Sequence, residues 1–204
     1  EFYGKAGGEV NLFFEEPRCA GQDNHSLSAF IEPTFYAEWA DGDISATFTP
    51  FARIDTADSE RTHFDIREAK LDFVADEWEV TVGLDTVFWG KTEAAHLVDI
   101  INQIDTLEDL DDEDNLGQPM IRVGRQFDFG TVQACYLPYF RKRAFPGTGG
   151  RLRAGLPIVE SAERIDVKGG RFVPSFALRY DGVFGGADIG LSGFHGVSRD
   201  PGFD

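Results

Sequence analysis

Apolar and polar residues alternate along two segments of this chain over unusually long distances. From residue 27 to 39 the odd positions are apolar or compact and most even positions are polar, and from 44 to 55 the parity is reversed. A period of two predicts a strand with two unlike faces. Strands of soluble proteins usually have about 5–6 residues, whereas a tilted strand needs about 9–11 residues to cross a bilayer. Both segments are therefore long enough to cross a membrane.

The same alternation continues along the chain and predicts nine strands. They are expected at residues 9–15, 26–40, 43–56, 62–76, 78–90, 120–130, 131–146, 171–184 and 187–199. Short connections at 41–43, 76–77, 130–131 and 185–186 take turns with longer ones at 16–25, 57–61, 91–119 and 147–170. Outer-membrane barrels have short periplasmic turns and long extracellular loops. We therefore predict an all-β fold, an antiparallel up-and-down transmembrane β-barrel with its N-terminus in the periplasm.

Two positions depart from the alternation. Within 62–76 the apolar parity changes, which predicts a β-bulge near Arg67 and Glu68. Within 120–130, Arg125 shares the parity of the apolar residues, and an arginine facing lipid at mid-depth costs about 2–4 kcal/mol. Arg125 therefore predicts either a second bulge or a contact with a neighbouring subunit of a homo-oligomer.

The strand count bears on closure of the barrel. Nine is odd, whereas bacterial single-chain barrels have an even number of strands. Residues 198–201 have the composition of the start of another long loop. We therefore expect residues 1–204 to form one transmembrane domain that is cut short at its C-terminal end, with further strands in the complete protein.

Composition excludes several other classes of function. The 204 residues carry a net charge of −17, which argues against nucleic acid as a partner. The first residues lack the basic and apolar regions of a signal peptide, so a secreted protein would be in its mature or trimmed form. Cys19 and Cys135 match no metal spacing and predict free thiols or one incidental pair. The histidines are scattered, at His25, His63, His96 and His195. We expect no enzyme activity, no cofactor and no metal.

The connection at 91–119 is the most distinctive loop. Helical spacing of apolar residues predicts a short helix over Ala94–Leu110. An acidic stretch overlaps and follows it, with the members Asp105, Glu108, Asp109, Asp111, Asp112, Glu113 and Asp114. Three interpretations remain open: a solvated acidic loop, a divalent-cation site, or a constriction loop folded into the pore. The EF-hand pattern of calcium loops is not met.

Six arginines are predicted to line the pore because of their parity. They are Arg53, Arg67, Arg122, Arg141, Arg143 and Arg179. They either pair with carboxylates inside the barrel, or form a basic wall opposite an inserted acidic loop that selects solutes by charge. A second basic cluster at the mouth comprises residues 141–143 with Arg151 and Arg153, and suits either lipopolysaccharide phosphates or the acidic loop.

Two motifs carry a family resemblance. FWGKTEAAHLVDIINQIDTLEDLDDEDNLGQPM, from Phe88 to Met120, resembles a signature of uncharacterised porin-like outer-membrane proteins of Gram-negative bacteria. LPYFRKRAFPGTGGRLR, from Leu137 to Arg153, is similar to the next hairpin of the same family. The resemblance covers roughly residues 60–200 and implies a barrel longer than this chain, without an established substrate or catalytic residues. Asn115 departs from the family pattern, which leads us to expect a lysine there.

These observations predict a bacterial outer-membrane channel for the passive diffusion of small hydrophilic solutes. Its partners would be those solutes, outer-membrane lipid and lipopolysaccharide. An alternative is a structural or docking barrel with a plugged lumen, whose extracellular loops bind a protein partner. A third interpretation is a soluble lipocalin-like barrel, which would have shorter strands and a charged outer face.

Overall fold

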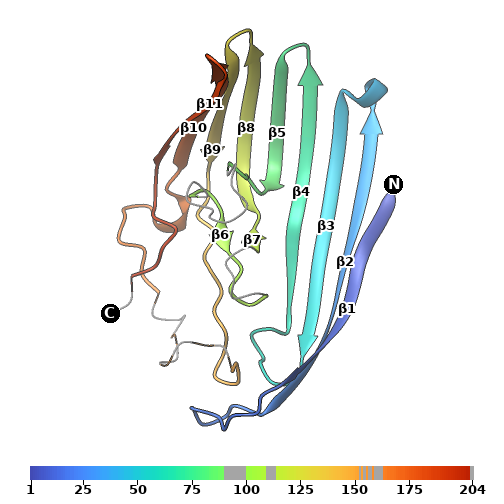
Figure 1. The fold of residues 1–204 in the computed structure, drawn as a ribbon, viewed down its shortest axis with the longest axis vertical. Helices are drawn as coiled ribbons and strands as arrows, with labels where there is room; N and C mark the ends of the chain where they lie inside the picture. Colours follow the sequence, from blue (N-terminus) through green and yellow to red (C-terminus); the bar gives the residue numbers. More distant parts are fainter. Residues whose placement is uncertain are drawn as a thin grey trace.

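The structure is a computed structural model that describes residues 1–89, 100–108, 114–151, 153, 155, 158 and 163–202. In this part of the chain, nine strands form one antiparallel sheet in which each strand pairs with its neighbours in chain order (Figure 1). The strands are β1 (Phe2–Leu12), β2 (His25–Trp39), β3 (Ile44–Asp55), β4 (His63–Ala75), β5 (Trp78–Asp85), β8 (Gln118–Phe127), β9 (Gly130–Leu137), β10 (Ser175–Phe184) and β11 (Ala187–His195). The all-β class and the nine antiparallel strands are confirmed. The sheet is open, because β1 and β11 do not pair with each other.

The connections alternate in length as predicted. All four short connections lie at one end of the sheet, at the top of Figure 1, and the β1–β2 and β3–β4 connections lie at the opposite end. The β2–β3 connection contains the 3₁₀ turn η1 (Ala40–Gly42), and the loop before β10 contains η3 (Gly170–Phe172). Gly185 and Gly186 join β10 to β11 with φ angles of 59° and 84°, as two-residue hairpin turns with left-handed backbone require.

Several strand boundaries differ from the prediction: β5 ends at Asp85, β10 begins at Ser175 and β11 ends at His195. Two further differences, in β1 and β9, have identifiable reasons. β1 begins at Phe2 rather than near residue 9, because glycines conceal the alternation there. A Cβ atom on Gly4 would lie 2.6 Å from the carbonyl oxygen of Glu32, so the close approach of β1 to β2 requires glycine. β9 ends at Leu137 because Pro138 has no N–H group to donate to a neighbouring strand.

The predicted bulge near Arg67 and Glu68 is confirmed. Thr49 of β3 pairs with Glu68 of β4, whereas Pro50 pairs with Ile66, so Arg67 is the extra residue. The parity of the apolar residues in β4 changes at this point, so that Phe64 before the bulge and Leu71 after it are both exposed.

The alternative prediction of a second bulge at Arg125 is wrong. Arg125 pairs in register with Trp78 of β5 and with Val132 of β9. Its guanidinium lies 4.8 Å from the ring centre of Trp78 and 4.7 Å from that of Phe127. These cation–π contacts offset part of the cost of a cation on the apolar face.

The two faces of the sheet differ sharply in polarity. One, the outer face, exposes large apolar side chains along its length; examples are Phe48, Ile54, Phe64, Tyr136, Phe176 and Leu178. Ile54 is 66% exposed and Leu178 is 55% exposed. The opposite, inner face buries polar and charged side chains, including Thr81, Asp85, Arg53 and Arg179. This distribution is the reverse of that in a soluble sheet, where the apolar face is the covered one.

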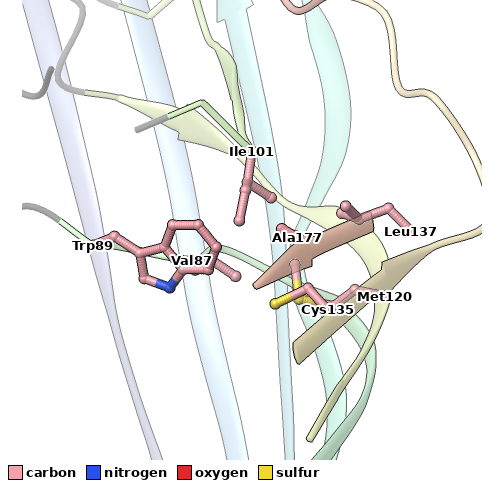
Figure 2. Close-up of a cluster of buried hydrophobic side chains, with 7 residues drawn as sticks. All are labelled: Val87, Trp89, Ile101, Met120, Cys135, Leu137 and Ala177. Carbon is pink, nitrogen blue, oxygen red and sulfur yellow. The ribbon is translucent and has the colours of Figure 1, made fainter. Parts of the chain in front are cut away.

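A small apolar cluster covers part of the inner face (Figure 2). Ile101 contributes to it from the segment before β6 (Gln103–Ile104), and Val87 and Trp89 contribute from the segment after β5. The sheet supplies Met120 from β8, Cys135 and Leu137 from β9, and Ala177 from β10. Cys135 is a free thiol, as is Cys19. The cluster therefore holds the chain that follows β5 against strands β8 to β10.

The helix predicted over Ala94–Leu110 is wrong for its described part. Residues 100–108 form bends and turns around β6, which pairs with β7 (Asn115–Leu116). The side-chain amide of Asn102 bonds the backbone N–H and carbonyl of Val87, at 3.0 and 2.7 Å. Extended pairing and these contacts with the sheet outweigh the helical spacing of the apolar residues; residues 94–99, 109 and 110 lie outside the described part. Within the described residues, no helix is long and apolar enough to cross a membrane.

Candidate functional site

A segment between β5 and β8 lies against the charged inner face of the sheet. We call residues 100–108 and 114–117 the inserted segment; it contains β6 and β7, drawn in front of the sheet in Figure 1. Ile101 anchors one part of this segment in the apolar cluster (Figure 2). Asp105 and Glu108 anchor another part through buried ion pairs with β3 and β4. The site therefore consists of the inner face and the segment fixed to it.

Arg53 of β3 makes the most extensive contact with the inserted segment. Its Nε donates to both carboxylate oxygens of Glu108, at 3.0 and 2.9 Å, and its Nη2 donates to Glu108 Oε2 at 2.6 Å. Nη1 donates to Glu9 of β1 at 3.0 Å and to Ser28 of β2 at 2.7 Å. Arg53 and Glu108 are each 6% exposed. Such a fork of charge-assisted bonds fixes both the position and the orientation of Glu108.

A second set of ion pairs lies along β4. Arg67, the extra residue of the bulge, bonds Asp105 of the inserted segment and Asp65 of its own strand. Its guanidinium also lies 4.2 Å from the ring centre of Phe51. Arg141, in the segment after β9, donates to the carboxylate of Asp65 and to the carbonyl of Gly117. The bulge therefore places the guanidinium of Arg67 beside Asp105 of the inserted segment.

Ion pairs also cover the inner face between β4 and β8. Lys70 donates to Asp85 at 2.8 Å, and Arg122 Nη2 lies 3.2 Å from the other oxygen of the same carboxylate. Arg122 also donates to Thr81 at 3.1 Å. On β10, Arg179 donates to both oxygens of Asp181, at 2.6 and 2.7 Å. Asp85 is 2% exposed and needs both cations, because a buried carboxylate is costly without partners.

All six arginines that parity predicted have a carboxylate partner within 4.0 Å. Arg53 and Arg67 pair with the inserted segment, whereas Arg122 and Arg179 pair with carboxylates of the sheet. Arg141 pairs with Asp65, and Arg143 lies 3.7 Å from Asp200. Four of the arginines therefore form paired charges on the strands, two of these hold the acidic segment, and Arg141 and Arg143 lie in the loop after β9, because β9 ends at Leu137 rather than continuing to residue 146.

Of the acidic residues singled out in the sequence, Asp105 and Glu108 reach the sheet. Asp114 is exposed, and its backbone carbonyl accepts a hydrogen bond from the Asp105 amide at 2.7 Å. Asp109, Asp111, Asp112 and Glu113 lie outside the described residues. Within the described ranges, no three histidine, cysteine, aspartate or glutamate side chains gather closely enough to hold a metal ion.

The sequence patterns missed several charged residues of the site. Lys70 has the inward parity of β4, so the alternation contained the signal that places it beside Asp85. Arg61 lies in the β3–β4 loop, where no period applies; it donates to the backbone carbonyl of Leu107 at 2.8 Å and pairs with Asp55. Together with Glu9, Asn11, Asp55 and Glu108, Arg61 lines a cavity of about 310 Å³ between the sheet, the inserted segment and the loop after β9.

The charged groups described on this face are guanidinium, ammonium and carboxylate side chains that bind one another. No family model, no curated protein and no solved structure matches this chain. The resemblance to porin-like proteins therefore stays a prediction, and a functional proposal depends on the arrangement of the two faces.

Proposed function

We propose that this chain forms the wall of a bacterial outer-membrane β-barrel that acts as a passive channel for small hydrophilic solutes. One observation carries the proposal: long strands expose apolar side chains on one face and bury charged side chains on the other. β2, β3 and β4 have 15, 12 and 13 residues, which exceeds the length of about 9–11 that a tilted strand needs to cross a bilayer.

Lipid is the environment that best suits the outer face. Leaving a large apolar side chain in water forgoes about 1.5–3 kcal/mol, and soluble monomers rarely expose apolar patches larger than a few hundred Å². Phe48, Ile54, Tyr136 and Leu178 belong to an exposed apolar set that extends over strands from β2 to β11. A soluble lipocalin-like barrel would place such residues inside, so the outer face argues against that alternative.

The edges of the sheet require partners in a membrane. Unpaired backbone N–H and C=O groups cannot face hydrocarbon, so spanning sheets close into barrels. The proposal therefore includes pairing of the free edges of β1 and β11, either with further strands or with another copy of the sheet.

The inner face supports a hydrated lumen with a constriction. Its charged groups, among them Arg61 and Glu108 at the cavity of about 310 Å³, suit water and small polar solutes. The inserted segment narrows this space, as constriction loops folded into a pore do. Since the arginines are paired with carboxylates, we propose that selectivity depends on the balance of paired charges along the lumen rather than on a uniformly basic wall.

One observation favours a second candidate, a docking barrel with a plugged lumen. The inserted segment is fixed at two points, by Ile101 in the apolar cluster and by the ion pairs of Asp105 and Glu108. A segment fixed so firmly is also suited to closing a lumen, in which case the long loops would bind an extracellular protein.

Ion conductance of the purified full-length protein in planar bilayers distinguishes the two candidates. A channel gives discrete current steps, and neutralising Arg53, Arg141 and Arg179 to glutamine is expected to change the ratio of cation to anion permeability. Absence of current at any voltage would contradict the channel and favour the docking barrel. Current with unchanged selectivity in the triple variant would leave a pore but remove the proposed basis of its selectivity.

Gel migration tests whether the protein forms a transmembrane barrel at all. An intact transmembrane barrel resists unfolding by detergent and is expected to migrate differently before and after boiling. For the conductance experiment, Arg18→Gln is the control substitution, because Arg18 is an exposed residue in the β1–β2 loop, away from the inner face. Identical migration of heated and unheated protein would contradict the membrane-barrel proposal.

A further inference from the structure

A second cavity lies beside the inserted segment, away from the ion pairs of Arg53 and Arg67. It measures about 470 Å³. Three stretches of chain contribute to it. They are Ile100, Asn102 and Ile104 from the inserted segment, Arg143 after β9, and Phe194 of β11 with Gly196, Ser198, Arg199 and Asp200 after it. This volume falls in the range of about 300–1,000 Å³ that is typical of small-molecule sites. It shares no lining residue with the cavity beside Arg61.

Arg199 is a buried cation at this cavity without a carboxylate partner among the described residues. It is 8% exposed, and its guanidinium lies 5.1 Å from the ring centre of Phe140 and 5.4 Å from that of Phe194. Nε donates to the carbonyl of Ile101 at 2.8 Å, whereas the buried Nη2 has no hydrogen-bond partner in the described part of the chain. Burial lowers the pKa of the Arg199 guanidinium to about 10. A buried charge of this kind is costly unless an anion neutralises it.

Arg143 adds a second guanidinium with free hydrogen-bonding capacity. Its Nη2 lies 3.7 Å from Asp200 Oδ1, which is an ion pair but is longer than a hydrogen bond. The Asp200 side chain is 93% exposed, so water screens this pair strongly. Nε and Nη2 of Arg143 are buried and have no hydrogen-bond partner within the described residues. Asp200 therefore leaves most of the donors of Arg143 available to another anion.

From this geometry we propose that the cavity binds a small organic carboxylate that carries an apolar body. The planar guanidinium fork fits a carboxylate, and both Arg143 and Arg199 line the cavity. Ile100, Ile104 and Phe194 line the same cavity and provide the contact for a hydrocarbon portion. This apolar lining distinguishes the expected ligand from inorganic phosphate, which has no apolar surface to bury.

Binding at this cavity is measured separately from conduction, on protein in detergent without any transport, although Ile100, Asn102 and Ile104 belong to the inserted segment. A protein that conducts ions without binding a carboxylate would overturn only the site. A protein that binds the carboxylate without conducting would overturn only the channel.

Titration calorimetry with benzoate tests the proposal on the full-length chain in micelles of an uncharged detergent, with a titration of empty micelles as the blank. The wild type is expected to bind one benzoate and to bind neutral benzamide far more weakly. Because charge-assisted hydrogen bonds are lost, Arg199→Gln and Arg143→Gln should each weaken benzoate binding by about tenfold or more. Arg199→Lys, which keeps the charge but loses the fork, should lie between Arg199→Gln and the wild type.

Arg18→Gln is the matched control and should bind benzoate as the wild type does, since Arg18 is exposed and lines neither cavity. Equal binding by Arg143→Gln and the wild type would overturn the proposal even if Arg199→Gln did not fold. Absence of benzoate binding up to about 10 mM, or benzamide binding as tight as that of benzoate, would also overturn it. Tighter binding of inorganic phosphate than of benzoate would contradict the role of the apolar lining.

Discussion

Replacing Glu108 by glutamine should loosen the inserted segment without unfolding the sheet. Glu108 lies on the segment and accepts hydrogen bonds from two nitrogens of Arg53, and His63 Nε2 lies 3.8 Å from Glu108 Oε1. Glutamine keeps the size of the side chain and one acceptor oxygen but removes the charge. Arg53 keeps its bonds to Glu9 and Ser28, so β3 retains its own contacts.

The expected size of the effect follows from burial and geometry. Both partners are 6% exposed, so solvent screens the pair little. A hydrogen bond to a charged group contributes about 1.5–3 kcal/mol, and the variant loses the equivalent of one such bond. Opening of the segment should therefore become about 10- to 150-fold more frequent. Ile101 remains in the apolar cluster, which keeps the opening local.

Native-state hydrogen exchange measures this opening directly. The amide of Asp105 donates to the carbonyl of Asp114 at 2.7 Å within the inserted segment, and it exchanges when the segment opens. Glu77→Gln is the control, because Glu77 is an exposed carboxylate in the short β4–β5 turn. Exchange at Asp105 that is equal in Glu108→Gln and Glu77→Gln would refute the reasoning. In a double-mutant cycle, Arg53→Gln should couple to Glu108→Gln by about 0.5–3 kcal/mol.

Three further predictions address the outer face, the apolar anchor and a hairpin. Leu178→Arg should reduce the free energy of folding into lipid vesicles by about 2–4 kcal/mol, whereas Leu178→Ile should not; equal values would contradict a lipid-facing position. Ile101→Ala should destabilise the packing of the inserted segment by about 2–5 kcal/mol and speed its cleavage by protease. Unchanged cleavage would show that the ion pairs alone are sufficient to hold the segment against the sheet. Gly186→Ala should lower stability to urea by about 1–2 kcal/mol because Gly186 has a φ of 84°. Gly193→Ala should lower stability to urea less, because no heavy atom lies within 4 Å of the Cβ that the substitution adds. Equal losses of stability in the two variants would contradict the left-handed backbone of the hairpin at Gly186.

The strands could be predicted because their two faces meet different surroundings. Ile54 and Arg53 are neighbours in sequence, and one is exposed on the outer face while the other is buried on the inner face. A period of two records this difference directly, and the change of parity at Arg67 was sufficient to predict the bulge. Gly4 carries no such signal, because a glycine that close packing between strands requires is neither polar nor apolar in its side chain.

The inserted segment could not be predicted from its own periodicity. Ile101 is buried by residues of β8, β9 and β10, and Glu108 is held by an arginine 55 positions away. Helical spacing depends only on the order of residues within a segment. Here the pairing of β6 with β7 and the contacts with the sheet determine the conformation instead. Arg61 and Arg199 lie in loops, where their partners depend on how distant segments meet.

The polarity of the two faces also explains why the inserted segment is held mainly by charge. The outer face uses most of the large apolar side chains of the sheet, so little apolar surface remains on the inner face beyond the cluster around Ile101. Ion pairs such as Arg53–Glu108 and Arg67–Asp105 then provide the attachment, and each guanidinium there has its own carboxylate. Arg199 departs from this rule, since the described chain gives it aromatic rings and carbonyls but no carboxylate. The two other arginines that are buried in the described part of the chain, Arg53 and Arg179, each have a carboxylate partner, and this difference is the reason to look for a ligand at Arg199.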